Sequence, residues 1–438
     1  YGLDSETNLE YFLNFQRKEI PPLLTPNYIL RYIIDYRAVN ALDNLNNGRI
    51  CYICNLVLKV MEKKITIKEV KNSKDLMAFI KFPMDLYKGN PYFVPPLIND
   101  EKNIWNPKEN PAYAYSEAKQ FLALKGEKVV GRVAVIINHK EAEELGIHKV
   151  RFGWLDFIDD IEVSEALFET VKNYAREKGI AKIEGPMGFT NLDKAGMLTK
   201  GFDRLATMIG IYNHSYYPEH LEKLGLSKEK KWVEFEIAFP DQLNEKILKF
   251  NDLVLEKHKL RVLKFKNKRE ILPFVEPMFK LLDETYKNLS TYTPITDEQI
   301  KTYKEKYFSF IDKDFIICIE NAKGELISFA ITMPSYSKAL QKANGKLFPF
   351  GWWHFLQAGR KNDRANFYLI GIHPDYQRQG ITSIIFKEIY DVFKKRGVKF
   401  LETNPELEEN KSIQLLWKDY NPENHKRRRT YSLTLDEI

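Results

Sequence analysis

The segment most informative about chemistry lies between Asn366 and Ser383, where an apolar stretch, a short polar loop and an amphipathic stretch follow one another. This pattern predicts a strand over 366–373 and a helix over 381–396, with Gly380 at the junction. The first backbone N–H groups of a helix lie at the positive end of its dipole and bind anions. A glycine has no Cβ and lets the backbone approach such an anion closely. The sequence therefore predicts a phosphate or pyrophosphate site here.

The loop at this junction resembles the acyl-CoA loop of the GNAT superfamily, the acyl-CoA-dependent N-acyltransferases. The family's loop reads Q/R-x-x-G-x-G/A after a strand, and residues 377–382 match it except at the last position, where Thr382 stands in place of glycine or alanine. The resemblance implies acetyl-CoA or another acyl-CoA as co-substrate, no metal, and a binding set of Ile372, Gln377, Arg378, Gln379, Gly380, Ile381 and Thr382. The alternative is a glycine turn that binds no ligand.

Strands alternate with helices along the rest of the chain, which predicts an α/β fold (α+β, with a mixed sheet). The same order of elements occurs twice, so we expect two tandem GNAT-like acyl-CoA N-acyltransferase units. Val129–Ala134 resembles the family's third strand, and Leu221–Leu226 resembles its late helix and turn. We divide the chain into an extension, a degenerate GNAT-like domain and a GNAT domain with the acyl-CoA loop, at residues 1–60, 61–240 and 245–434.

The first 60 residues show weak periodicity, and regular alternation of apolar and polar residues begins only after Met61. We interpret Met61 as the native start and the preceding residues as an extension outside the native protein. The alternative is a genuine N-terminal helical module.

The first unit lacks a glycine where the second has its acyl-CoA loop, and it carries three carboxylates there: Asp159, Asp160 and Glu162. Carboxylates repel a pyrophosphate, so we expect only the second unit to hold acyl-CoA. The first unit would then shape the acceptor site. We predict that Tyr212, Asn213 and Tyr216 bind the acceptor and face the helix start at Gly380; the alternative is that they hold their own loop.

Acyl transfer to an amine needs a base for the amine and an acid for the leaving thiolate. GNAT enzymes often use a tyrosine on the helix after the fifth strand, and the resemblance places Trp417 at that position. Tyr420, one turn further on, is the candidate acid, and the alternative is a core position. His373 and Glu402 are the nearest candidates for the base, and the alternative for Glu402 is a solvated edge position.

Composition bounds the class of protein. The 438 residues are 44% hydrophobic and 29% charged, which is typical of a globular protein and excludes a disordered chain. The formal net charge of +7 fits an anionic ligand without requiring nucleic acid. We interpret the basic run Lys426–Arg429 as a solvated face, and contact with phosphate is the alternative.

Three cysteines cannot build a disulfide framework, so we expect an intracellular, cytoplasmic protein. The stretch Asn90–Pro96 resembles one in bacterial tandem GNAT-like proteins, which implies a bacterial protein. Cys51 and Cys54 form a CxxC with no second pair at zinc spacing, and Cys318 lies in an apolar run typical of a core. No apolar stretch has the length of a membrane-spanning helix, so no membrane contact is expected.

These observations together favour an acyl-CoA-dependent N-acyltransferase, with acetyl as the expected acyl group and a small-molecule or peptide amine as the acceptor. The alternatives are a non-catalytic acyl-CoA-binding or scaffold protein and an aminoacyl-tRNA-dependent transferase on the same fold. Binding of tRNA is the only nucleic-acid contact that this interpretation leaves open.

Overall fold

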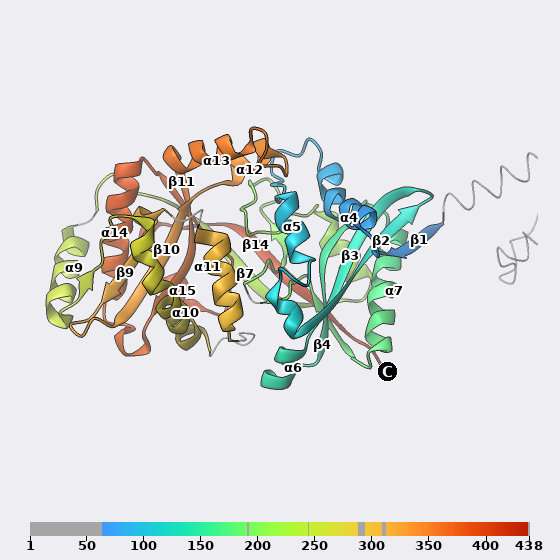
Figure 1. Cartoon of the computed structure of the whole chain (residues 1–438), viewed down its shortest axis with the longest axis horizontal. Coiled ribbons are helices and arrows are strands. Elements are labelled where there is room, and N and C mark those ends of the chain that lie inside the picture. The colour runs from blue at the N-terminus through green and yellow to red at the C-terminus, as the bar shows by residue number, and fades with distance from the viewer. Residues whose placement is uncertain (1–63, 191, 244, 288–293, 309–311, 437–438) are drawn as a thin grey trace, which may run out of the picture. The chain divides into compact units, whose positions relative to one another are not determined.

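The computed structural model describes residues 64–438 except 191, 244, 288–293, 309–311 and 437–438 (Figure 1). The predicted extension over 1–60, with its CxxC pair, lies outside the described residues. The acyl-CoA loop and all the predicted site residues lie inside them.

The first half of the described chain alternates strands and helices in the predicted order (Figure 1). Its strands are β1 (Ile65–Glu69), β2 (Ser116–Lys125), β3 (Lys128–Asn138), β4 (Lys149–Phe157), β5 (Lys182–Gly185), β6 (Met197–Lys200) and β7 (Ser227–Ala238). Its α-helices are α4 (Ser73–Leu86), α5 (Ile98–Ile104), α6 (His139–Leu145), α7 (Ile161–Glu177) and α8 (Tyr216–Lys223).

The second half repeats this order with additions. Its strands are β8 (Arg261–Val262), β9 (Ile316–Glu320), β10 (Leu326–Pro334), β11 (Arg364–Ile372), β12 (Phe400–Thr403), β13 (Glu406–Leu407) and β14 (Glu423–Thr434). Its α-helices are α9 (Glu245–His258), α10 (Leu272–Tyr286), α11 (Asp297–Phe308), α12 (Ser337–Ala343), α13 (Gly351–Arg360), α14 (Ile381–Arg396) and α15 (Lys411–Gln414), and a 3-10 helix follows at Leu415–Tyr420. Residues 411–420 thus form a short α-helix followed by a 3-10 helix.

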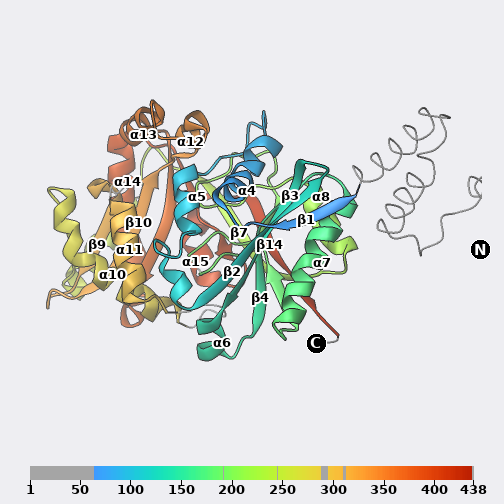
Figure 2. The same cartoon turned by 45° about the vertical axis from the view of Figure 1, so that its right-hand side comes forward.

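The strands of both halves form one continuous sheet in the order β1-β2-β3-β4-β5-β14-β7-β12-β11-β10-β9-β8. Neighbours are antiparallel except β4–β5 and β11–β12, so each half has one parallel pair and the mixed α/β fold is confirmed. Each parallel pair is joined by a crossover helix, α7 in the first half and α14 in the second. Helix α7 lies against the strands of the first half (Figure 2).

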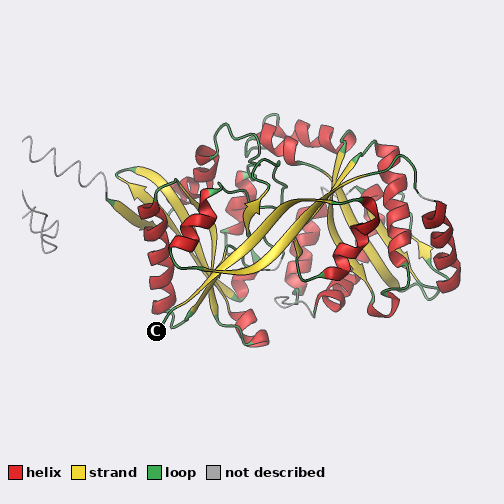
Figure 3. Cartoon of the chain, turned by 180° about the vertical axis from the view of Figure 1, so that it is seen from behind, coloured by secondary structure: helices red, strands yellow, loops and turns green. Residues whose placement is uncertain are grey.

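The last strand of each half pairs with the fifth strand of the other half. Strand β7 pairs with β12, and β14 pairs with β5. The two long strands also pair with each other and cross the centre of the sheet (Figure 3). Repetition of element order predicts a duplication, but this exchange depends on contacts between residues far apart in the chain.

Each half buries its own apolar core between sheet and crossover helix. In the second half, α14 presents an inward stripe of Ile381, Ile384, Ile385, Ile389 and Phe393. The spacing is that of one helix face, and Gly397 ends the helix in the left-handed conformation. Cys318 is fully buried, as its apolar run predicts. Among the described residues, no helix combines the length and apolar character needed to cross a membrane.

Candidate active site

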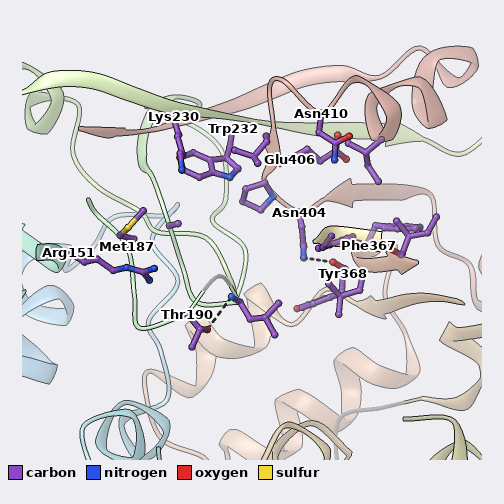
Figure 4. Close-up of a pocket in the computed structure, with 18 of the residues that line it drawn as sticks. Arg151, Met187, Thr190, Lys230, Trp232, Phe367, Tyr368, Asn404, Glu406 and Asn410 are labelled. Atoms are coloured by element: carbon purple, nitrogen blue, oxygen red, sulfur yellow. Dashed lines mark hydrogen bonds between the residues drawn. The ribbon is translucent and has the colours of Figure 1, made fainter. Parts of the chain in front are cut away.

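A pocket of about 200 Å³ lies where β11 and β12 diverge, and residues of both halves line it (Figure 4). The first half contributes Lys149, Arg151, Met187, Thr190, Leu192, Ala195, Lys230 and Trp232. The second half contributes Tyr286, Phe367, Tyr368, Leu369, Ile370, Asn404, Pro405, Glu406, Leu407, Asn410 and Ile413. The divergence of two parallel strands beyond their carboxyl ends is a common place for a ligand site.

The two strands separate abruptly. Phe367 pairs with Thr403 at the last position of the ladder, and β11 then continues to Ile372 beside β10 alone. Tyr368 sits at a bulge, because its neighbours pair with consecutive residues of β10. Asn404 spans the start of the gap, since its backbone N–H donates to the Phe367 carbonyl (3.2 Å) and its side chain donates to the Tyr368 carbonyl (2.8 Å).

Glu406 is the titratable group that the geometry singles out in this pocket. The indole Nε1 of Trp417 donates to its Oε1 atom at 2.8 Å. Its Oε2 atom is buried and has no hydrogen-bond partner among the described residues. Burial raises the pKa of Glu406 to about 7, although the bond from Trp417 acts in the opposite direction. A carboxylate with a pKa near neutrality suits a general base.

The opposite wall of the pocket is basic but internally compensated. The Lys149 ammonium lies 3.0 Å from both Glu141 and Glu184, and Arg151 lies 2.8 Å from Glu141. Burial lowers the pKa of Lys230, which lines the same wall. Because the carboxylates neutralise Lys149 and Arg151, this wall is a rigid polar surface with little excess charge.

The loop at the start of α14 has the features of an anion site. Gly380 has φ of 86° and precedes the helix, and no side chain caps the first turn. Gln377 and Gln379 fold back onto the backbone carbonyls of Ile372 and Asp375, and Arg378 is exposed. Uncapped N–H groups and a nearby cation fit a pyrophosphate. The predicted binding residues therefore lie together at this helix start.

The structure corrects the reason for glycine at position 380. A Cβ there would meet the Phe250 ring at 2.7 Å and the Val254 side chain at 2.9 Å, because α9 packs directly over the residue. The left-handed φ adds a second requirement. Gly380 is thus explained by backbone conformation and helix contact rather than by the approach of an anion.

The corresponding helix start in the first half is occupied by its own carboxylate. Asp160 caps α7 by accepting from the Glu162 N–H at 3.1 Å, and it also pairs with Lys125 at 3.1 Å. Asp159 lies 3.0 Å from His220. A capped, acidic helix start does not favour a phosphate, which agrees with the prediction that only the second half holds acyl-CoA.

The three predicted catalytic residues lie elsewhere than the pocket lining. Glu402 is buried and bonded to Lys426, and burial raises its pKa. His373 lies at the end of β11, 3.7 Å from Glu284. The Tyr420 ring stacks on Phe386. Sequence reasoning missed Glu406, although it lies three residues after the end of β12, where cleft residues occur.

The predicted acceptor residues make their hydrogen bonds within the first half. The Tyr212 hydroxyl donates to the Phe202 carbonyl at 2.9 Å, and the Tyr216 hydroxyl donates to the Phe157 carbonyl at 2.6 Å. Asn213 is 1% exposed and bonds both backbone groups of Leu198. The prediction that Asn213 faces a cleft is therefore wrong, because its side-chain amide forms hydrogen bonds that hold its own loop. These three residues are all absent from the lining of the pocket at Glu406.

The side chains of the basic run on β14 point alternately into the core and into solvent. The prediction of a solvated face is therefore wrong. Arg427 is exposed, whereas Lys426 and Arg428 are each 1% exposed. Lys426 bonds to Glu402, and Arg428 bonds to Glu234. Glu234, Glu402 and His425 lie within 4.8 Å of one another, but Lys426 and Arg428 already neutralise the two carboxylates.

His425 should make stability depend on pH. Burial, together with the charge of Lys426, lowers its pKa to about 2. The histidine's contribution is complete above the unfolded pKa of about 6.5 and is lost as the pH falls, because only the unfolded state then gains the proton. Relative to His425→Gln, the wild type should lose up to about 1.4 kcal/mol per pH unit below about pH 6. Urea unfolding of both proteins between pH 7.5 and 5 measures this, and a constant difference would contradict it.

Comparisons with known proteins agree with the geometry. The acetyltransferase (GNAT) family model matches residues 277–418, which run from α10 to the 3-10 helix after α15. Protein YghO of Escherichia coli (strain K12) is 26% identical over 374 residues, covering 83% of this chain and 94% of YghO. Bacterial ceramide synthase of Caulobacter vibrioides (strain NA1000 / CB15N) is 22% identical over 384 residues, covering 85% of this chain and 98% of that protein.

Solved structures share the fold. A GCN5-related glucosamine N-acetyltransferase region of a fungal multi-domain GH3 β-N-acetylglucosaminidase superposes with a TM-score of 0.51 at 12% identity, covering 85% of this chain and 38% of that chain. A tandem GNAT protein from the clavulanic acid biosynthesis pathway gives a TM-score of 0.49 at 10% identity, covering 85% and 98%. Residues 277–418 therefore carry the match to the GNAT family, and the repeated half-sheets give the chain a tandem GNAT-like fold.

Proposed function

We propose that this protein is an acyl-CoA-dependent N-acyltransferase whose reaction takes place in the pocket at Glu406. The observation that carries the proposal is a buried carboxylate with a pKa near 7, placed where the parallel strands of the GNAT half diverge. The uncapped start of α14, on the same half, supplies a site for the pyrophosphate of the donor.

The residues of this chain supply proton transfer and orientation. Glu406 would take a proton from the bound ammonium, so that the neutral nitrogen forms the new C–N bond as the C–S bond of the thioester breaks. Burial raises the pKa of Tyr286 to about 12, so this pocket-lining phenol stays protonated at neutral pH. It would donate its proton to the leaving thiolate, and the phenolate would take the second proton from the nitrogen as the amide forms. The backbone of Tyr368, at the bulge, is placed to orient the donor.

One relative favours a class of acceptor. The similarity to the bacterial ceramide synthase extends over nearly the whole of that protein, and the name of that protein describes a lipid product. We propose a long-chain amine as the acceptor, with a small-molecule or peptide amine as the second candidate. A scaffold that only binds acyl-CoA and a transferase using aminoacyl-tRNA are outcomes that the assay below distinguishes.

The assay measures release of free thiol from a series of acyl-CoAs, with long-chain and short-chain amines as acceptors. The proposal predicts thiol release that depends on the amine, with a higher kcat/KM for the long-chain amines. Binding of acyl-CoA without thiol release for any amine would indicate a scaffold. Transfer from aminoacyl-tRNA but from no acyl-CoA would overturn the choice of donor.

Reversing the charge of Arg378 should weaken acyl-CoA binding. The side chain is exposed beside the uncapped start of α14, so Arg378→Glu replaces attraction to a phosphate by repulsion. We expect the Kd for acyl-CoA to rise about ten-fold or more, corresponding to at least about 1.4 kcal/mol. Calorimetric titration measures this, with Arg427→Glu on β14 as a matched exposed control. An equal Kd for both variants and the wild type would show that the pyrophosphate lies elsewhere.

A further inference from the structure

The insertion between β10 and β11 carries an aromatic surface. Five large apolar side chains within residues 348–356 are exposed: Phe348 (78%), Phe350 (74%), Trp352 (43%), Trp353 (46%) and Leu356 (46%). We call this set the α13 surface. Single exposed apolar residues are ordinary on proteins, but a contiguous group indicates an interaction site.

The α13 surface is the outer side of an anchored segment. Gln341 of α12 donates to the carbonyls of Pro91 and Phe93 at 2.8 and 2.9 Å. On the inner side of α13, Phe355 is buried and stacks on Tyr336 with ring centroids 5.4 Å apart. Helices α12 and α13 lie together outside the sheet, at the top of the view (Figure 1). The inner side therefore makes the packing contacts that hold the segment in place. The apolar side chains of the outer side are not needed for that packing.

The charged side chains within residues 335–362 have one sign. Residues 335–362 contain no aspartate or glutamate, and they contain five cations, all exposed: Lys338, Lys342, Lys346, Arg360 and Lys361. A segment that exposes both cations and aromatic side chains complements an anionic surface that also accepts apolar side chains. Two copies of the same surface would instead bring like charges together, which opposes self-association through it.

We propose that the α13 surface docks on the interface of an anionic lipid bilayer. Tryptophan and phenylalanine side chains insert at the level of the headgroups, and lysines are attracted to anionic lipids. Docking of this kind needs no membrane-spanning segment, so it differs from the sequence-based expectation of no membrane contact, which considered only such segments. The inference goes beyond the proposed reaction and does not depend on it.

Cosedimentation of the full chain with lipid vesicles tests the proposal. The chain should bind vesicles of phosphatidylglycerol and phosphatidylcholine, bind phosphatidylcholine alone more weakly, and dissociate as salt increases. The double variant Phe348→Ser/Phe350→Ser should reduce partitioning about ten-fold, because it removes the two most exposed rings. Leu145→Ser is the matched control, since Leu145 is an exposed apolar residue of α6 outside the α13 surface.

A second pair of variants separates charge from apolar contact. Lys342→Glu/Lys346→Glu should weaken binding to anionic vesicles, whereas Lys128→Glu at the start of β3 should not. No binding to anionic vesicles, or equal binding by every variant, would overturn the proposal. So would a concentration-dependent dimer that Phe348→Ser/Phe350→Ser abolishes, because the occupant would then be a second copy. Acyl-CoA affinity, measured in parallel, should be unchanged in all these variants, which keeps this result distinguishable from a failure of the proposed reaction.

Discussion

Replacing Glu406 by glutamine should lower kcat about 10²- to 10³-fold while leaving the affinity for acyl-CoA nearly unchanged, because general-base catalysis contributes rate factors of this size. The amide is close in shape to the carboxyl group and can still accept from Trp417, but it cannot take a proton. The measurement is thiol release under saturating amine, together with a calorimetric Kd for acyl-CoA.

The pH dependence gives this prediction a second readout. Because the pKa of Glu406 is raised to about 7, wild-type kcat should increase with pH through about 7 as the carboxyl group ionises. That limb should disappear in Glu406→Gln. Trp417→Phe removes a hydrogen bond to the ionised form, so it should move the limb to higher pH.

Glu408→Gln is the matched control. Glu408 lies two residues further along the same segment and pairs with Lys231 at 3.4 Å outside the pocket lining. Its replacement should leave both kcat and the pH limb as in the wild type. If Glu406→Gln retained wild-type kcat, the base would have to be another group or solvent.

Replacing Arg428 by methionine should destabilise the fold by about 3–5 kcal/mol, because it leaves Glu234 buried without its counter-charge. Arg428 and Glu234 are 1% and 0% exposed, and the guanidinium also donates to the Ile211 carbonyl. The ion pair joins β14 to β7 at the point where the two halves exchange strands. Urea unfolding of both proteins at neutral pH measures the difference.

Arg427→Met is the control on the same strand, and its exposed position predicts a change within about 0.5 kcal/mol. The double variant Arg428→Met/Glu234→Met should recover most of the loss, since no buried charge then remains unpaired. Equal stabilities for Arg428→Met and Arg427→Met would show that the pair contributes nothing to folding.

The sequence by itself determined the local elements of this protein. The apolar periodicity of 381–396 predicts the helix whose bounds are those of α14, and the apolar stretch over 366–373 predicts β11. The glycine loop between them also predicts an anion site, because loop, strand and helix are contiguous in the chain. Such features depend on contacts between near neighbours, which periodicity reports directly.

Only the tertiary structure decided which distant groups meet. The exchange of β7 and β14 turns Lys426 and Arg428 inward, so a basic run that resembles a solvated face becomes two buried ion pairs. The same exchange brings Trp232 of the first half beside Glu406 of the second, and the turn after β12 sets the carboxyl group against Trp417. A carboxylate becomes a base near neutral pH through burial by residues from elsewhere in the chain, and its own neighbours in sequence do not reveal that burial.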